Sequence, residues 1–375
     1  MSVKPIKVVH VIYDMSTAGA QTVVMNYLRS MKDDPLYELE VLLRDSYKGT
    51  EYEKELQQEG YKISYSGYIP TTKFRIIRPV INWIKCQIAM CRSIRSIHPD
   101  IVHTHIANIL PFVCFPSLFS SIKIKVHTLH SDPYAISKAY SMWTRIALKV
   151  FGFFPVCVTE DQAEKVKTRY RIDSVKVIHN GLDIKTYTQW KGNADEVKER
   201  YLIPKGMFVI GYVGSLYSTK NVPFLINVFN EYVKINPKSV LLIVGDGVDR
   251  KNLEAKCKEK GIEDKVIFTG VQKDVCSLYH VMDVFVLPSR YESSSIVTLE
   301  AQLCGVRCVI SDAVPKDVII SDSVNRLSLS DPIGMWVKAV NGDIRPDDVQ
   351  NRPYDFSIEG SILQTKDLYM DLLRN

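Results

Sequence analysis

The chain has 375 residues, 46% hydrophobic and 24% charged, which is typical of a soluble globular protein long enough for two cores. No stretch reaches the roughly 20 apolar residues of a membrane-spanning helix, and the first residues predict a buried strand rather than a signal peptide. The eight cysteines lack paired metal-site spacing, so we expect reduced thiols in a cytoplasmic protein. We expect no nucleic-acid partner.

Short apolar segments alternate with helical patterns along most of the chain. In the first half we expect strands at 6–12, 37–43, 61–66, 100–105, 122–128, 154–160 and 174–180. In the second half we expect them at 207–214, 239–247, 265–270, 283–288, 307–312 and 325–329. This alternation predicts an α/β protein with two doubly wound, Rossmann-like domains, each a parallel sheet covered by helices.

The domain boundary is expected in the polar segment 184–199. The predicted N-terminal domain covers residues 1–185, the second covers 186–352, and residues 353–375 form a helix that packs back on the first. Each half opens with a strand, a loop containing a small residue and a helix, but neither loop has the complete GxGxxG of a dinucleotide site. The two domains should face each other across a cleft between the carboxyl ends of their strands, where such folds bind ligands.

Charge is uneven between the halves. Residues 1–185 hold 25 Lys and Arg against 17 Asp and Glu, a net charge of +8, whereas the remainder is −2. The segment Lys73 to His98 has six Lys and Arg and no acidic residue, and Arg78, Lys85 and Arg92 would form one stripe on a helix. A solvated stripe on a core helix and a contact with an anionic membrane are both open at this point.

The second half contains polar residues that suit a nucleotide-sugar. Lys220 should lie at the mouth of the first strand-to-helix loop, where a cation meets a diphosphate. Ser293, Ser294 and Ser295 should cap a helix from about Ile296, whose dipole favours an anion. The carboxylates of Glu292 and Glu300 would accept hydrogen bonds from sugar and ribose hydroxyls on either side of that diphosphate.

At this point the sequence resembles the retaining GT-B glycosyltransferases of family four, over nearly its whole length. The main motif is PSRYESSSIVTLEAQLCG, in which Glu292 and Glu300 are the two glutamates of E-x7-E. Further matches are STAGAQTVVMN, HTH, VHTLHSD, VIHNGLD and the Lys220–Asn221 pair. The segment SDSVNRLSLSDPIGMWVKAV is similar to the subgroup of bacterial exopolysaccharide and capsule gene clusters.

The resemblance implies a role for each matching position. Glu300 would bind the ribose, and Lys220 would bind the diphosphate in place of a metal, so no metal or other cofactor is expected. Glu292 and the amides that follow it would bind the donor sugar, and His130 would face the reacting sugar. The implied catalytic residues are His130, Glu292 and Lys220. The implied donor-binding residues are Gly19, Ser215, Lys220, Val271, Ser293, Ser294, Ser295, Ile296 and Glu300.

Two positions depart from the family pattern. Ser215 stands where relatives usually carry an Arg on the diphosphate, and loss of one charged contact could cost about 1.5–3 kcal/mol. Serines follow Glu292 where relatives have glycine, often with proline. His103, His105 and His127 are interpreted as core or strand-end histidines.

The resemblance implies a retaining, metal-independent hexosyltransferase. Its donor would be a UDP-sugar, and its acceptor a saccharide or lipid-linked hydroxyl in cell-surface polysaccharide synthesis. It would work in the cytoplasm or at the inner face of the plasma membrane. A catalytically impaired subunit that binds nucleotide-sugar or glycan and supports a partner enzyme is the alternative. A GT-B epimerase or phosphorylase is a weaker one, since the phosphorylase needs a pyridoxal-phosphate lysine that we cannot place.

Overall fold

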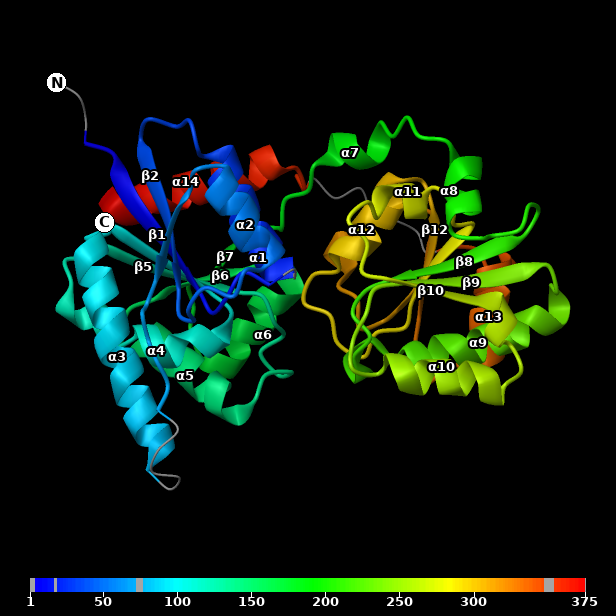
Figure 1. Ribbon diagram of the computed structural model, residues 1–375, viewed down its shortest axis with the longest axis horizontal. Coiled ribbons are helices and arrows are strands. Elements are labelled where there is room, and N and C mark those ends of the chain that lie inside the picture. Colours follow the sequence, from blue (N-terminus) through cyan, green and yellow to red (C-terminus); the bar gives the residue numbers. More distant parts are fainter. Residues whose placement is uncertain (1–3, 17–18, 72–76, 347–353, 375) are drawn as a thin grey trace. The chain divides into compact units, whose positions relative to one another are not determined.

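The computed structural model describes all residues except 1–3, 17–18, 72–76, 347–353 and 375. The chain divides into two compact units, each an α/β structure with its own sheet (Figure 1). The first unit contains Met1–Leu182 and Asp355–Asn375, and the second contains Asp183–Tyr354. The break at 182/183 lies three residues before the break expected from the sequence.

The first unit is built on a seven-stranded parallel sheet with the order β3-β2-β1-β4-β5-β6-β7. Its strands are β1 (Ile6–Ile12), β2 (Tyr37–Leu43), β3 (Lys62–Tyr65), β4 (Ile101–His105), β5 (Ile124–Leu129), β6 (Phe154–Cys157) and β7 (Lys176–Val177). Its helices are α1 (Gly19–Ser30), α2 (Glu51–Gln58), α3 (Arg78–Ile97), α4 (Leu110–Val113), α5 (Lys138–Lys149), α6 (Glu160–Tyr170) and α14 (Ile358–Arg374). Short 3-10 turns η1 (Ala107–Ile109) and η2 (Pro116–Phe119) flank α4.

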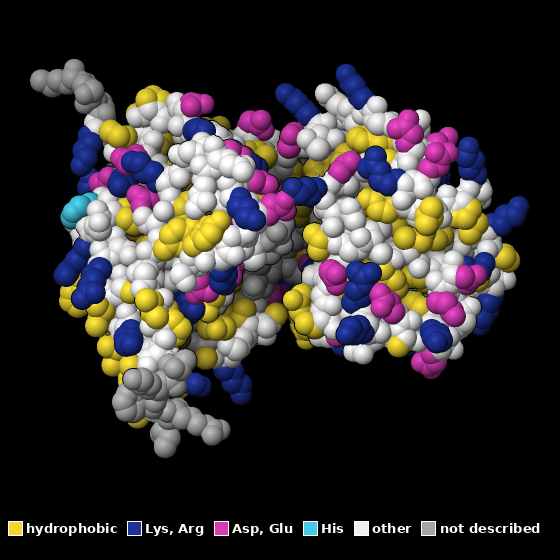
Figure 2. Space-filling view, viewed as in Figure 1, with side chains coloured by type: hydrophobic (Ala, Val, Ile, Leu, Met, Phe, Trp, Pro, Cys, Tyr) yellow, Lys and Arg dark blue, Asp and Glu magenta, His cyan; other side chains and the backbone are white. Residues whose placement is uncertain are grey.

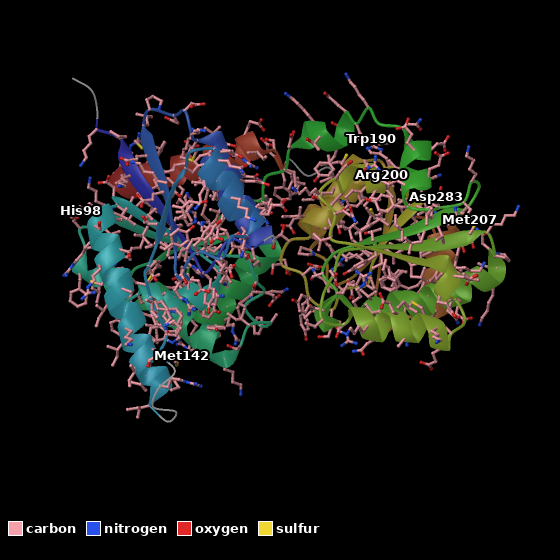
Figure 3. The ribbon with its side chains drawn as sticks, viewed as in Figure 1. His98, Met142, Trp190, Arg200, Met207 and Asp283 are labelled. Atoms are coloured by element: carbon pink, nitrogen blue, oxygen red, sulfur yellow. The ribbon has the colours of Figure 1, made fainter. Side chains whose placement is uncertain are left out.

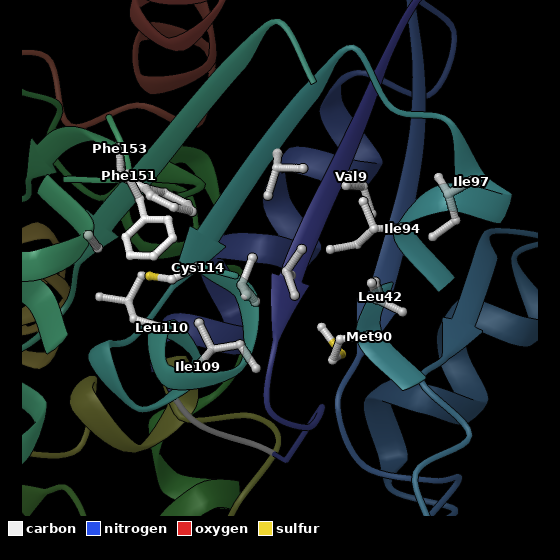
Figure 4. Packing of buried hydrophobic residues seen from close by; sticks show 14 of the residues in the cluster. Val9, Leu42, Met90, Ile94, Ile97, Ile109, Leu110, Cys114, Phe151 and Phe153 are labelled. Atoms are coloured by element: carbon white, nitrogen blue, oxygen red, sulfur yellow. The ribbon is translucent and has the colours of Figure 1, made fainter. Parts of the chain in front are cut away.

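Alternate residues of the central strands bury opposite faces of this sheet, because side chains along a strand point to alternate sides. Val9 and Val11 of β1 pack with α3, α4 and α5, in the cluster drawn in Figure 4, where Met90 and Ile94 of α3 lie near Val9 and Leu42. Val8 and Ile101 pack on the other face against α1 and α14. The two faces therefore have separate cores.

Helix α14 returns to the first unit after the chain has passed through the second. Ile362, Leu368 and Tyr369 of this helix are buried with Val8, Tyr27 and other residues of the α1 face. The side chain of Lys366 pairs with Asp34 at 2.5 Å. The last helix thus completes the core of the unit that begins the chain.

The second unit has a six-stranded parallel sheet with the order β10-β9-β8-β11-β12-β13. Its strands are β8 (Phe208–Val213), β9 (Ser239–Val244), β10 (Val266–Gly270), β11 (Val284–Leu287), β12 (Arg307–Ser311) and β13 (Val324–Leu327). Its helices are α7 (Ile184–Thr188), α8 (Ala194–Arg200), α9 (Val222–Ile235), α10 (Arg250–Glu259), α11 (Cys276–Tyr279), α12 (Ile296–Leu303) and α13 (Ile333–Asn341). Three 3-10 turns, η3 (Ser218–Lys220), η4 (Glu263–Lys265) and η5 (Lys316–Val318), complete it.

The predicted α/β class with two parallel-sheet domains is confirmed, and a strand lies within or across each of the thirteen expected segments. The largest difference is β7, which has two residues instead of seven, because it pairs only with Val156 and Cys157 at the edge of the sheet. Among the described residues, no helix combines the length and apolar character needed to cross a bilayer.

Candidate functional site in the second unit and its histidine counterpart in the first

The loops after β8 and β11 lie where the order of strands reverses, because β8 pairs with β9 on one side and β11 on the other. Such a switch point is where open α/β sheets bind ligands. Lys220 ends η3 in the first loop, and Glu292 lies in the second. Their side chains form an ion pair of 2.7 Å, and Ser289 donates a hydrogen bond of 2.7 Å to the same Glu292 oxygen. The residues predicted to bind the diphosphate and the donor sugar, Lys220 and Glu292, are thus in direct contact with each other.

Backbone contacts hold this edge of the sheet tightly together. A Cβ on Gly245 would stand 2.0 Å from the carbonyl oxygen of Gly214, and one on Gly247 would stand 2.5 Å from that of Leu216. The loop after β9 therefore needs these glycines to pack on the loop after β8. Ser215 lies between Gly214 and Leu216 and is exposed, and its carbonyl accepts a hydrogen bond from the Tyr212 hydroxyl.

Arg290 ties the β8 loop to the β11 loop. Its backbone N–H donates to the carbonyl of Thr219 at 2.8 Å, and its guanidinium donates to the Asn221 side chain at 3.2 Å. Asn221 has φ 55°, the left-handed conformation that asparagine tolerates better than most residues. Lys220 and Glu292 are therefore held by two loops that are joined to each other.

Glu300, in α12, is held by two tyrosine hydroxyls. Tyr187 of α7 donates to one carboxylate oxygen at 2.7 Å, and Tyr279 of α11 donates to the other at 2.8 Å. Burial raises the pKa of Glu300, and the two tyrosine hydrogen bonds oppose that rise. Each carboxylate oxygen keeps a lone pair for a further donor. This arrangement suits acceptance of hydrogen bonds from a diol.

Helix α12 begins at Ile296 as expected, but the side chain of Ser295 does not cap it. Ser295 occupies the N-cap position without capping the backbone, because its hydroxyl bonds that of Thr298 at 2.8 Å. Ser293 and Ser294 are partly exposed just before it. Within the described chain none of these serines is in the left-handed region, so a Cβ fits at each of them without backbone strain.

Two further predicted residues, Val271 and Gly19, are exposed. Val271 follows the carboxyl end of β10, and 69% of its surface is exposed. Gly19 is the first residue of α1 in the other unit, and a Cβ there would meet nothing within 4 Å. The protein itself therefore does not require glycine at position 19. Thr17 and Ala18, which precede Gly19 in the predicted loop, lie outside the described residues.

The predicted His130 lies after β5 in the first unit and is half-buried. Its Nε2 is 3.1 Å from Nδ1 of His105, and Nε2 of His105 is 3.0 Å from Nδ1 of His10. His105 and His10 are fully buried. Burial lowers the pKa of His10 to about 3 and that of His130 to about 4, and it lowers the pKa of His105 well below the usual value. The rings are therefore neutral at pH 7.

His103 and His127 are core residues, as expected. His103 lies within 2.6 Å of the Tyr369 hydroxyl and within 2.6 Å of the Thr128 hydroxyl. Although His10, His103 and His105 are close enough to share a metal ion, both ring nitrogens of His103 are already engaged. A second such group, Cys276, His280 and Cys304, contains none of the predicted donor-binding residues. The ring of Trp190, labelled in Figure 3, stacks on the His280 ring with centroids 4.4 Å apart.

The structure brings Lys220 into contact with Glu292 and surrounds Glu300 with tyrosines. Sequence reasoning missed Tyr187, Tyr279 and His10, because none belongs to a quoted motif that assigns it a role. Ser289 and Arg290 lie inside the PSRYE motif, so the motif could have identified them as residues that support the site.

Two family models match the chain in succession. The model described as Glycosyltransferase Family 4 matches residues 17–186, and the one described as Glycosyl transferases group 1 matches residues 193–342. The Bacillus subtilis protein EpsF, assigned as a glycosyltransferase, is 26% identical over 89% of this chain and 86% of its own length. The Escherichia coli UDP-Gal:alpha-D-GlcNAc-diphosphoundecaprenol alpha-1,3-galactosyltransferase is 24% identical over 99% of this chain and 98% of its own.

Solved structures share the fold at low sequence identity. HepE from Anabaena, in complex with UDP and glucose, superposes with a TM-score of 0.80 at 17% identity, over 98% of this chain and all of that one. Sucrose-phosphate synthase from Thermosynechococcus elongatus gives a TM-score of 0.77 at 16% identity, over 98% of this chain and 99% of that one. Since the two family models together span most of its length, the chain belongs to the family-four glycosyltransferases and has their GT-B fold.

Proposed function

We propose that the protein transfers a hexose from a UDP-sugar to a hydroxyl of a saccharide or lipid-linked acceptor in cell-surface polysaccharide synthesis. The observation that carries the proposal is the Lys220–Glu292 ion pair at the switch point between β8 and β11. A diphosphate would replace Glu292 as the partner of Lys220, and sugar hydroxyls would replace Lys220 as the partner of Glu292. In the free protein, each of these two charged side chains therefore serves as the other's partner in the ion pair.

Glu300 would accept hydrogen bonds from the ribose diol, beside the two tyrosines that hold it. The exposed Val271 would pack near the base. Lys220 and the amides from Ser293 to Ile296 would bind the diphosphate and sugar without a metal. A bond would form between the acceptor oxygen and the anomeric carbon as the bond to the diphosphate breaks, and the acceptor proton would pass to the departing diphosphate. Attack on the same face would retain the configuration.

The comparisons support a UDP-linked donor. The Escherichia coli relative uses UDP-Gal according to its name, and HepE has been crystallised with UDP-glucose as well as with UDP and glucose. The first also names a lipid-linked acceptor, a diphosphoundecaprenol saccharide.

An impaired binding subunit is the second candidate, because Ser215 stands where a cation is expected. The serines after Glu292 do not support it, since their backbone lies outside the left-handed region and keeps its amides in place. A screen decides between the two candidates. Hydrolysis and thermal shift are measured with UDP-, GDP- and ADP-sugars. Turnover of a UDP-sugar supports the enzyme, stabilisation without turnover supports the subunit, and neither effect with any donor refutes both.

Helix α3 presents a surface that suits an anionic membrane. Arg78, Lys85 and Arg92 are exposed along one side, and Val80, Ile84 and Ile88 are 47–59% exposed on the neighbouring side. We call these six residues the α3 face. Figure 2 shows basic and hydrophobic side chains over this helix, which ends near the labelled His98 in Figure 3. Lys73 and Arg75, also part of the predicted basic segment, lie outside the described residues.

We propose that the α3 face binds the inner leaflet during transfer to a lipid-linked acceptor. Each cation near such a surface contributes about 1 kcal/mol. Changing Arg78, Lys85 and Arg92 to Gln should release the protein from phosphatidylserine vesicles in flotation at low salt. The matched control changes Lys238, Lys251 and Lys258 of the second unit, which alters the net charge equally. Wild-type protein that fails to float at low salt would refute membrane docking but leave the transferase proposal intact.

A further inference from the structure

His10, His105 and His130 form a continuous hydrogen-bonded chain in the first unit. It runs from β1 through β4 to the loop after β5, with nitrogen separations of 3.0 and 3.1 Å. The inner end, Nε2 of His10, is buried and has no partner among the described residues. At the half-buried outer end, Nδ1 of His130 has no partner among them either. The family resemblance implies a role for His130 alone among these three residues, so the two inner rings still need an explanation.

All three rings are neutral, because burial lowers their pKa values. A neutral imidazole carries one N–H and one lone pair, so the two hydrogen bonds can form in only two ways. In the outward arrangement, Nδ1–H of each inner ring donates to Nε2 of the next ring, and His130 carries its proton on Nδ1. In the inward arrangement every bond is reversed, and His130 presents a lone pair.

The inner end decides between the two arrangements. The inward one would bury the Nε2–H of His10 without an acceptor, whereas the outward one leaves only a lone pair unpaired there. Unpaired buried N–H groups are rarer in proteins than under-used acceptors. Tyr27 stacks on the His10 ring with centroids 5.2 Å apart, and its hydroxyl bonds Thr365 instead. The outward arrangement is therefore favoured.

His127 on β5 shows the same pattern outside the chain. The Thr104 hydroxyl donates to the carbonyl of Val126 at 3.1 Å, so it must accept the hydrogen bond from Nδ1–H of His127 at 2.9 Å. Nε2 of His127 is then a buried lone pair without a partner among the described residues. The core of this unit thus accommodates the unpaired lone pair that the outward arrangement requires at His10.

We propose that His10 and His105 are positioning residues that fix His130 as a neutral Nδ1–H donor aimed at an oxygen of the donor sugar. This rests on the proposed function, together with the role that the family resemblance implies for His130, which is to face the reacting sugar. Two aligned hydrogen bonds polarise one another and strengthen the outer donor. Because the donor is neutral, it stays unchanged across neutral pH.

The direct test is histidine-selective nitrogen-15 NMR on the wild-type protein at pH 7.5. Signals are assigned from the variants His10→Gln, His105→Gln and His130→Gln. We expect all three rings in the Nδ1–H form. Finding His130 in the Nε2–H form would overturn the proposal. This readout needs no substrate, so it stands whether or not a UDP-sugar is turned over.

Kinetics test the consequence for transfer. His105→Leu should lower kcat/KM for the UDP-sugar about tenfold and leave the UDP dissociation constant unchanged, because UDP lacks the sugar. His105→Gln should restore most of the loss, since an amide can donate to His130 and accept from His10. His127→Gln, a buried histidine outside the chain, is the packing control. Equal losses in His105→Leu and His127→Gln would show a structural role only. No turnover by the wild type would count against the proposed function and not against the NMR result.

Discussion

The Lys220–Glu292 pair makes the change Glu292→Gln informative, because it separates binding of the diphosphate from binding of the sugar. In the free protein the Glu292 carboxylate lies 2.7 Å from the Lys220 ammonium group. The Lys220 side chain is 24% exposed and the Glu292 side chain is 6% exposed. UDP must compete with this carboxylate. If the contact contributes about 1 kcal/mol, as at the upper end for solvent-accessible pairs, its removal should tighten UDP binding roughly fivefold.

The same change should impair use of the sugar. A hydrogen bond to a charged group contributes about 1.5–3 kcal/mol, so kcat/KM for the UDP-sugar should fall roughly 10- to 100-fold. Calorimetry with UDP and initial rates with UDP-sugar measure the two effects. Glu231→Gln, which removes the exposed ion pair to Lys234 on α9, is the matched control. Weaker UDP binding in Glu292→Gln would refute the exchange of partners.

Four further outcomes are expected. Glu300→Gln should raise the UDP dissociation constant at least tenfold with the thermal midpoint little changed, and unchanged affinity would exclude a ribose contact. Ser215→Arg should tighten binding of UDP more than that of uridine, whereas equal effects would mean that the loop is organised around serine. EDTA should leave UDP affinity unaltered, and its loss would show that a metal is required. The free energy of unfolding should fall from pH 6.5 toward pH 4, by about 1.4 kcal/mol per pH unit for each histidine whose folded pKa is lowered to about 3 or 4. These groups stabilise the fold above their unfolded pKa, so urea titrations that show no such fall would contradict their burial as neutral rings.

The strands were predictable because parallel strands buried on both faces read as continuous apolar runs. Segments such as SVLLIVGDG and DVFVLP end in loops that the structure places at one edge of the sheet. The short β7 was not predictable, because its length depends on how far β6 extends beside it. Local sequence determines that a strand forms, whereas pairing determines where it stops.

The site could be predicted only where residues share a motif. Glu292, Glu300 and Lys220 were predicted in this way, but the contact between Lys220 and Glu292 spans 72 residues and follows from sheet order. Tyr187 lies 113 residues from Glu300, in a segment read as a polar boundary. The Ser295 cap failed because Thr298 offers the hydroxyl a competing partner. Contacts made by tertiary packing leave little trace in local sequence.

The return of α14 to the first unit has a consequence for synthesis on the ribosome. Residues 183–354 emerge before residues 358–374, so the second unit has its whole sequence available while the first still lacks a helix. Until then, Val8 and Ile101 remain uncovered by α14, and His103 has no Tyr369 hydroxyl to bond, a partner 266 residues later. Domains generally fold as units when their residues are present. The nascent chain therefore completes its second unit first, and a chaperone would find its binding surface on the first.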